Sequence, residues 1–127
     1  MSGERPDVLG PAGHYQNALL HGGLVFSAGM TPKDSGGLLA RGRVGEEIPV
    51  DRARHLAFLA ARRALDAVEE AAGRASQRVV RVVQMTVYLA TGAEFTEHST
   101  VADGASRAVT ERFPAVPPPA RAAVGGS

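Results

Sequence analysis

A single arginine near the end of the chain has the setting that best suits binding chemistry. Arg121 follows three consecutive prolines, residues 117–119, and precedes a short apolar segment. Proline fixes φ and cannot donate to a sheet, so the run forms a stiff lead-in to a possible strand. An arginine held in this way can direct its planar, permanently charged fork at a carboxylate. The alternative is a solvated arginine at a junction between a loop and a strand, because most surface charges bind nothing specific.

The other titratable groups form no comparable site. Among the four histidines, His98 has acidic neighbours at short spacing, Glu94 and Glu97, and this arrangement is ordinary on a helix. We therefore predict no metal site. Glu46 and Glu47 are adjacent, and neighbouring side chains on a strand point apart, so this pair is predicted to be solvated. The glycines between residues 36 and 45 lack a phosphate-binding pattern, and we predict no cofactor.

The composition fits one globular domain over residues 1–127. Hydrophobic residues make up 44% of the chain, the formal net charge is +1, and there is no cysteine for a disulfide or a thiolate. Arginines of the first predicted helix are diluted by acidic residues without interleaved aromatic residues, which argues against a nucleic-acid platform. No apolar run has the length of a membrane span, and no signal peptide is recognisable, so the default location is cytoplasmic.

Two hairpin strands and one long helix are predicted in the first half of the chain. Residues 1–12 are expected to be irregular. Residues 14–20 and 24–28 predict strands around a tight turn, because paired glycines accept positive φ, and residues 38–44 predict a short edge strand. Asp51 is a predicted N-cap, followed by an amphipathic helix over residues 52–72 that stops at Gly73.

The second half predicts a strand, a helix and a last strand after Arg121. In the strand over residues 79–90, one apolar face suits packing beneath helices: Val83, Met85, Val87 and Leu89. The opposite face is mixed and suits a subunit interface or a site: Val80, Val82, Gln84, Thr86 and Tyr88. Residues 91–94 match a capping box for a helix that runs to about Phe113. Gly104 inside this helix indicates either close packing or a weak point. The order β-β-(β)-α-β-α-β predicts an α+β or α/β sandwich with both helices on one face.

Several segments, in this order and spacing, resemble the Rid (YjgF/RidA) family of enamine and imine deaminases. The resemblance extends over about residues 13–125 and rests on residues 13–18, 23–32, 82–89, Phe95 and 119–124, with the long alanine-rich helix between them. Residues 101–106 and the Pro-Ala-Arg-Ala-Ala-Val-Gly ending are similar to a divergent branch of the family. The resemblance implies a chorismate-mutase-like α+β fold and a homotrimer with sites between subunits.

The resemblance also implies roles for individual residues. Arg121 would bind the carboxylate of a small-molecule substrate, and Tyr15 would line the cleft. Backbone groups around Gly29 and Ala123 would approach the substrate or its attacking water, and Ser99 takes a helix position that is often asparagine. The implied reaction is hydrolysis of a 2-imino or enamino acid to a 2-keto acid and ammonia, without metal or cofactor.

The chain departs from the family pattern at four places, two of which are Ser99 in place of the asparagine and Ala123 in place of a cysteine two residues after the arginine. Ala28 stands where a serine is common, with Ser27 one residue earlier. The sequence stops at Ser127, before the position of the family's last strand and its glutamate. We therefore expect a single domain that lacks this strand. The departures favour a second hypothesis, a non-catalytic trimer that binds small carboxylates or a partner enzyme. A third hypothesis is a ribonuclease, which the near-neutral charge disfavours.

Overall fold

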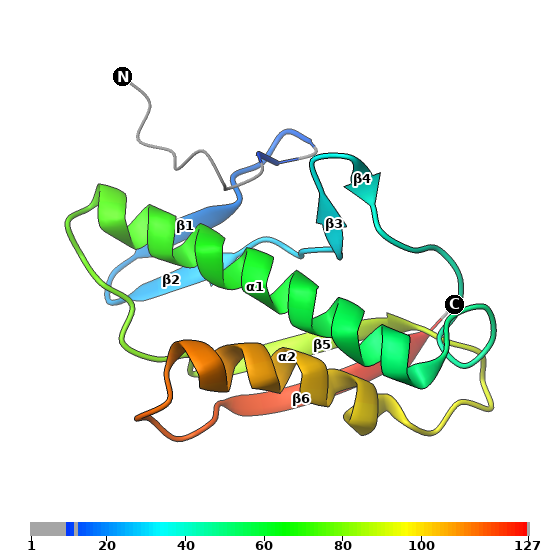
Figure 1. The fold of residues 1–127 in the computed structure, drawn as a ribbon. Coiled ribbons are helices and arrows are strands. Elements are labelled where there is room, and N and C mark those ends of the chain that lie inside the picture. Colours follow the sequence, from blue (N-terminus) through cyan, green and yellow to red (C-terminus); the bar gives the residue numbers. More distant parts are fainter. Residues whose placement is uncertain (1–9, 12, 127) are drawn as a thin grey trace.

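Strands and helices follow one another along the chain in the predicted order, except that two short strands precede the first helix where one edge strand was predicted (Figure 1). The computed structural model describes residues 10–11 and 13–126, so the irregular segment expected over residues 1–12 lies almost wholly outside the described residues. The elements are β1 (Ala18–His21), β2 (Leu24–Ser27), β3 (Lys33–Asp34), β4 (Gly37–Leu38), α1 (Val50–Arg74), β5 (Gln84–Ala90), α2 (His98–Arg112) and β6 (Ala120–Gly126).

The strands form three two-stranded ladders. β1 and β2 are the predicted antiparallel hairpin, although β1 begins later than expected, and Gly22 in the turn has a φ of +61°. β3 and β4 form a second, smaller hairpin in place of the predicted edge strand over residues 38–44. β5 and β6 are parallel, with Met85 opposite Arg121, and α2 is the crossover between them.

The two helices lie against each other in front of the strands in Figure 1. A Cβ atom on Gly104 of α2 would stand 1.8 Å from the carbonyl oxygen of Arg54 on α1. Close packing therefore explains this glycine. At the other end of the contact, Arg112 of α2 pairs with Asp66 of α1 at 3.1 Å and also with Glu69. The position of α2 relative to α1 is fixed at both ends.

Three apolar clusters along α1 form the core. The alanines of the helix allow close approach to its neighbours, and longer side chains fill the spaces between them. The buried members are Val44, Ile48, Ala53, Leu56 and Val101 in the first cluster, Phe58, Leu65, Ala108 and Val109 in the second, and Ala18, Ala67 and Ala71 in the third. Helix α1 therefore links the β1–β2 hairpin to α2.

Tertiary contacts move the ends of both helices away from their predicted positions. Pro49 is the N-cap of α1, and Asp51 lies in the first turn, where it pairs with Arg54 at 3.0 Å. The helix also continues past Gly73 to Arg74. The predicted capping box at residues 91–94 is wrong, because the N–H of Thr91 donates to the carbonyl of Gly126 at 2.9 Å and extends the sheet.

The predicted two faces of the 79–90 strand are correct only from residue 84 onward. Met85, Val87 and Leu89 are half-buried on the helix side, as expected. Val83 is 62% exposed, and Val82 packs against the second core cluster instead, because regular strand alternation starts only at Gln84. The outward face carries exposed apolar pairs in register, Tyr88 opposite Val124 on β5–β6 and Leu19 opposite Phe26 on β1–β2. Among the described residues, neither helix combines the length and apolarity needed to cross a membrane.

Candidate functional site

Arg121 lies near the start of β6, and its guanidinium is directed at α2. Only 19% of its side chain is exposed. Nη1 donates to Asp103 Oδ1 at 2.8 Å and to Ser106 Oγ at 2.9 Å. Nη2 donates to Ser99 Oγ at 2.7 Å and to the Ser99 carbonyl at 3.4 Å. These four hydrogen bonds can occupy the four N–H groups of the two terminal nitrogens and leave only Nε–H.

Three polar residues of α2 hold this arginine because they share one face of the helix. Ser99, Asp103 and Ser106 are spaced by four and three residues, which places them one above another on consecutive turns. The Asp103 side chain is 62% exposed, so one side of its ion pair with Arg121 faces solvent. Ser99 was a predicted site residue, whereas Asp103 and Ser106 were not predicted, although the spacing of the three residues is plain in the sequence.

Three of the five predicted site residues lie together. Ser99 contacts Arg121 directly, and Ala123 follows on the same face of β6, two residues farther along the strand and opposite Val87. This side of the sheet faces the helices, since Arg121 and Ala123 are half-buried and Ala122 between them is exposed. Arg121, Ser99 and Ala123 therefore form one group, which we call the arginine group.

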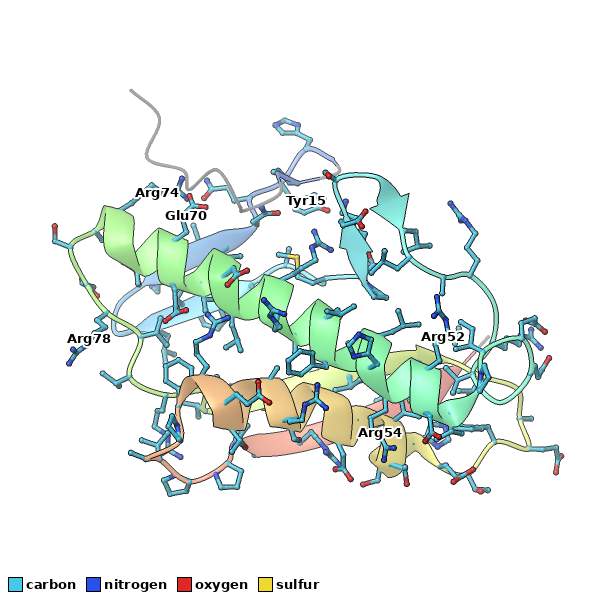
Figure 2. The ribbon with its side chains drawn as sticks, in the orientation of Figure 1. Tyr15, Arg52, Arg54, Glu70, Arg74 and Arg78 are labelled. Carbon is cyan, nitrogen blue, oxygen red and sulfur yellow. The ribbon has the colours of Figure 1, made fainter. Side chains whose placement is uncertain are left out.

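Tyr15 and Gly29 lie elsewhere, beside the β1–β2 hairpin and the middle of α1. Figure 2 shows Tyr15 far from the ribbon of β6, and Gly29 comes two residues after the end of β2. Arg63 of α1 donates to the carbonyl of Thr31 at 2.5 Å. Burial lowers the pKa of Arg63, and the nearby phenol of Tyr15 acts in the opposite direction. Tyr15 and Gly29 form a second group that does not meet the first within one chain.

The arginine group is suited to holding a carboxylate. A guanidinium that is mostly shielded from water and fixed by neutral hydroxyls and a carbonyl keeps its charge and its geometry. It already donates a hydrogen bond to one carboxylate, that of Asp103, at a partly exposed position. Within the described part of the chain, no three His, Cys, Asp or Glu side chains converge to hold a metal ion.

Comparisons with known proteins place these features in a wider context. The family described as Endoribonuclease L-PSP matches residues 5–127. Protein TCP17 of Trypanosoma cruzi is 31% identical over 108 residues, which span 85% of this chain and 67% of that protein. Two crystal structures are also similar. Atu1372 of Agrobacterium tumefaciens, of unknown function, has a TM-score of 0.80 at 29% identity, over 92% of this chain and 74% of the other. A provisionally assigned endoribonuclease of Shewanella oneidensis has a TM-score of 0.85 at 25% identity, over 97% and 81%.

Proposed function

Because the chain belongs to the endoribonuclease L-PSP family, the YjgF/RidA family, we propose that it hydrolyses a reactive 2-imino or enamino acid to a 2-keto acid and ammonia. The observation that carries the proposal is the guanidinium of Arg121, which α2 fixes with four hydrogen bonds and which already holds one carboxylate. A substrate carboxylate has the same charge and geometry as the Asp103 side chain and would replace it on Nη1.

The reaction needs positioning and proton transfer. The oxygen of water adds to the C2 carbon of the C=N bond, and the nitrogen takes up a proton. A further proton transfer lets the C–N bond break, so that ammonia leaves and the C2 carbonyl forms. Water and imino acid thus become keto acid and ammonia with no change of electron count. Holding the carboxylate on Arg121 fixes C2 for this attack, which is the main contribution expected of the site.

We propose that Tyr15 and Gly29 complete the site from a neighbouring subunit of a homotrimer. Their separation from Arg121 within one chain supports this arrangement, as do the exposed apolar pairs Leu19–Phe26 and Tyr88–Val124 on the outward sheet face. Apolar pairs of this kind mark interaction surfaces. Light scattering of the 127-residue chain should give the mass of three chains, and Tyr88→Asp should lower it; a monomeric parent would contradict the arrangement.

An activity assay with matched arginine variants tests the proposal. Iminopyruvate is generated in solution and ammonia release is followed with and without the protein. Loss of a charge-assisted hydrogen bond predicts that Arg121→Ala lowers kcat/KM by about 10- to 100-fold. Arg78→Ala removes the same charge from an exposed position after α1 and should leave the rate unchanged (Figure 2). If the parent gives no acceleration over buffer, the deaminase proposal is wrong.

A non-catalytic carboxylate-binding protein is the second candidate, and the Asp103 contact favours it. The guanidinium of Arg121 already pairs with Asp103 through Nη1, and a ligand carboxylate can exchange with that side chain. Such binding needs no group that transfers protons. Calorimetry with 2-keto acids separates the two functions, since binding without turnover supports this candidate.

A ribonuclease receives less support, despite the description of the family. Tyr88 and Phe26 are exposed, but Phe58, the aromatic residue that lies beneath Arg62 and Arg107, is buried and cannot stack with bases beside these arginines. RNA cleavage that persists through stringent purification would reverse this judgement.

A further inference from the structure

A cavity of about 340 Å³ lies at the carboxyl ends of the parallel strands β5 and β6. Figure 1 shows this end of β6 beside the loop that connects β4 to α1. The backbone N–H of Val44 in that loop donates to the carbonyl of Ala90 at 2.8 Å, so the loop is fastened to the sheet there. The carboxyl ends of parallel strands, before a crossover helix, are a common place for ligands. None of the five predicted site residues lines this cavity.

A hydroxyl group borders the cavity and forms no hydrogen bond with a described residue. Thr91 lines the cavity and is only 3% exposed. Its backbone N–H is bonded to Gly126, but no described residue forms a hydrogen bond with its side-chain oxygen Oγ1. A threonine hydroxyl can donate one hydrogen bond and accept others. The arrangement therefore leaves a donor available for a ligand.

A histidine side chain also borders the cavity, close to the Thr91 hydroxyl. His98 is the first residue of α2, and its ring packs edge-on against Phe95 with centroids 5.1 Å apart. Neither ring nitrogen hydrogen-bonds to a described residue. A Cβ atom on Gly125 would stand 2.2 Å from His98 Nε2 and 2.6 Å from Thr91 Oγ1. These distances leave no room for a side chain at this position, so the glycine lets the hydroxyl and the imidazole nitrogen approach β6 together.

Arg43 supplies a guanidinium that can attract an anion to the cavity. Arg43 lines it, and no carboxylate of the described chain pairs with the Arg43 guanidinium, since Glu47 accepts the Arg43 backbone N–H instead, at 2.8 Å. The opposing charge is Glu46, whose Oε2 would be 2.7 Å from a Cβ on Gly92 at the rim. Hydroxyl, imidazole and guanidinium donors together match the two oxygens of a carboxylate.

We propose that this cavity binds a small carboxylate at a second site, separate from the arginine group. Gly125 lies four residues beyond Arg121 on the same face of β6, which is about 13 Å along a strand. A ligand of three or four carbons cannot touch both positions. The second site therefore goes beyond the proposed function, and its presence does not depend on catalysis at Arg121.

Ring proton signals of the histidines in the full chain provide the test, with sodium pyruvate as the probe. Titration is done in the Arg121→Ala variant, so that binding at the arginine group does not contribute. His98→Gln assigns the His98 signal among the four histidines. We expect only that signal to move, and to saturate with pyruvate. Thr91→Val should weaken binding about tenfold or more, while Thr91→Ser should keep it within about threefold.

Surface variants keep the test decisive if Thr91→Val does not fold. Arg43→Gln should weaken pyruvate binding several-fold, and Glu46→Gln should strengthen it, because both side chains are exposed and only the charge at the cavity changes. The proposal is overturned if all four histidine signals move alike, if the His98 signal does not move, or if neither charge variant alters the titration. Tighter binding of inorganic phosphate than of pyruvate would overturn the assignment to carboxylates.

Discussion

Two positions on the same face of β6 meet helix α2 in opposite ways. At Arg121, the guanidinium is already engaged. Both of its terminal nitrogens donate hydrogen bonds to Ser99, Asp103 and Ser106. At Gly125 there is no side chain, and the weaker donors around it have no hydrogen-bond partner among the described residues. The difference shows that the most highly charged residue of a site is not necessarily its most available donor.

Helix α2 determines both environments, since it crosses both positions. Ser99, Asp103 and Ser106 on its polar face fix the guanidinium of Arg121. A guanidinium that is already fixed loses little conformational freedom when a substrate carboxylate binds, which favours affinity. The first residue of the helix, His98, stands over Gly125 instead. A change in the position of α2 should therefore alter ligand binding at both Arg121 and the cavity beside Gly125. A change at Asp103 should alter binding only at the arginine group.

Gly104→Ala should affect stability and binding more than Asp103→Ala does, because it displaces the helix that borders both Arg121 and Gly125. The added Cβ meets the backbone carbonyl of Arg54, which cannot rotate away as a side chain could. Overpacking of this kind predicts a loss of about 1–3 kcal/mol in the free energy of unfolding. Urea denaturation followed by circular dichroism measures it. Pyruvate binding should weaken both at Arg121 and at the His98 cavity.

A second helical glycine supplies the control for this variant. Gly73 lies in α1, and a Cβ there would meet nothing within 4 Å. Gly73→Ala should leave stability unchanged or raise it by about 0.5–1 kcal/mol, through helix propensity alone. Equal unfolding midpoints for the two variants would show that close packing of α2 on α1 is not what Gly104 provides.

The sequence predicted the order of elements and the family, because hydrophobic periodicity and punctuation by glycine and proline are local signals. It also predicted the helix-facing side of β5 from Met85 onward. It could have predicted the partners of Arg121, since the spacing of residues 99, 103 and 106 needs only an α-helix. The roles of Tyr15 and Gly29 stay predictions, because they depend on contacts between chains.

Other features could not be predicted from local patterns. Thr91 has the sequence of a helix cap, but pairing with Gly126 and the bridge to Val44 draw it into the sheet. The cavity at His98 is formed in part by Arg43, which lies in the loop between β4 and α1, far from His98 in the sequence. Tertiary contacts override local propensity at both places, so local patterns could not place His98 beside a cavity.

Asp103→Ala should have the smaller effect and should sharpen the contrast between the two positions. It frees the side of Nη1 that Asp103 occupies, and the exposed pair contributes about 0–1 kcal/mol to stability, so the fold should be little changed. We expect 2-keto acids to bind the arginine group about three- to tenfold more tightly, because a charged competitor has gone. Calorimetry in the Thr91→Val background isolates this site.

Glu111→Ala is the matched control, since it removes the same charge from the same helix. Glu111 pairs with Arg107 at 3.5 Å at an exposed position and does not touch Arg121. Binding should therefore stay as in the parent, and any gain common to both variants would be a general effect of net charge. Weaker binding in Asp103→Ala alone would mean that the aspartate holds the fork in position for the substrate and does not compete with it. The arginine group would then resemble a prepared site, with Asp103 as one of its supports.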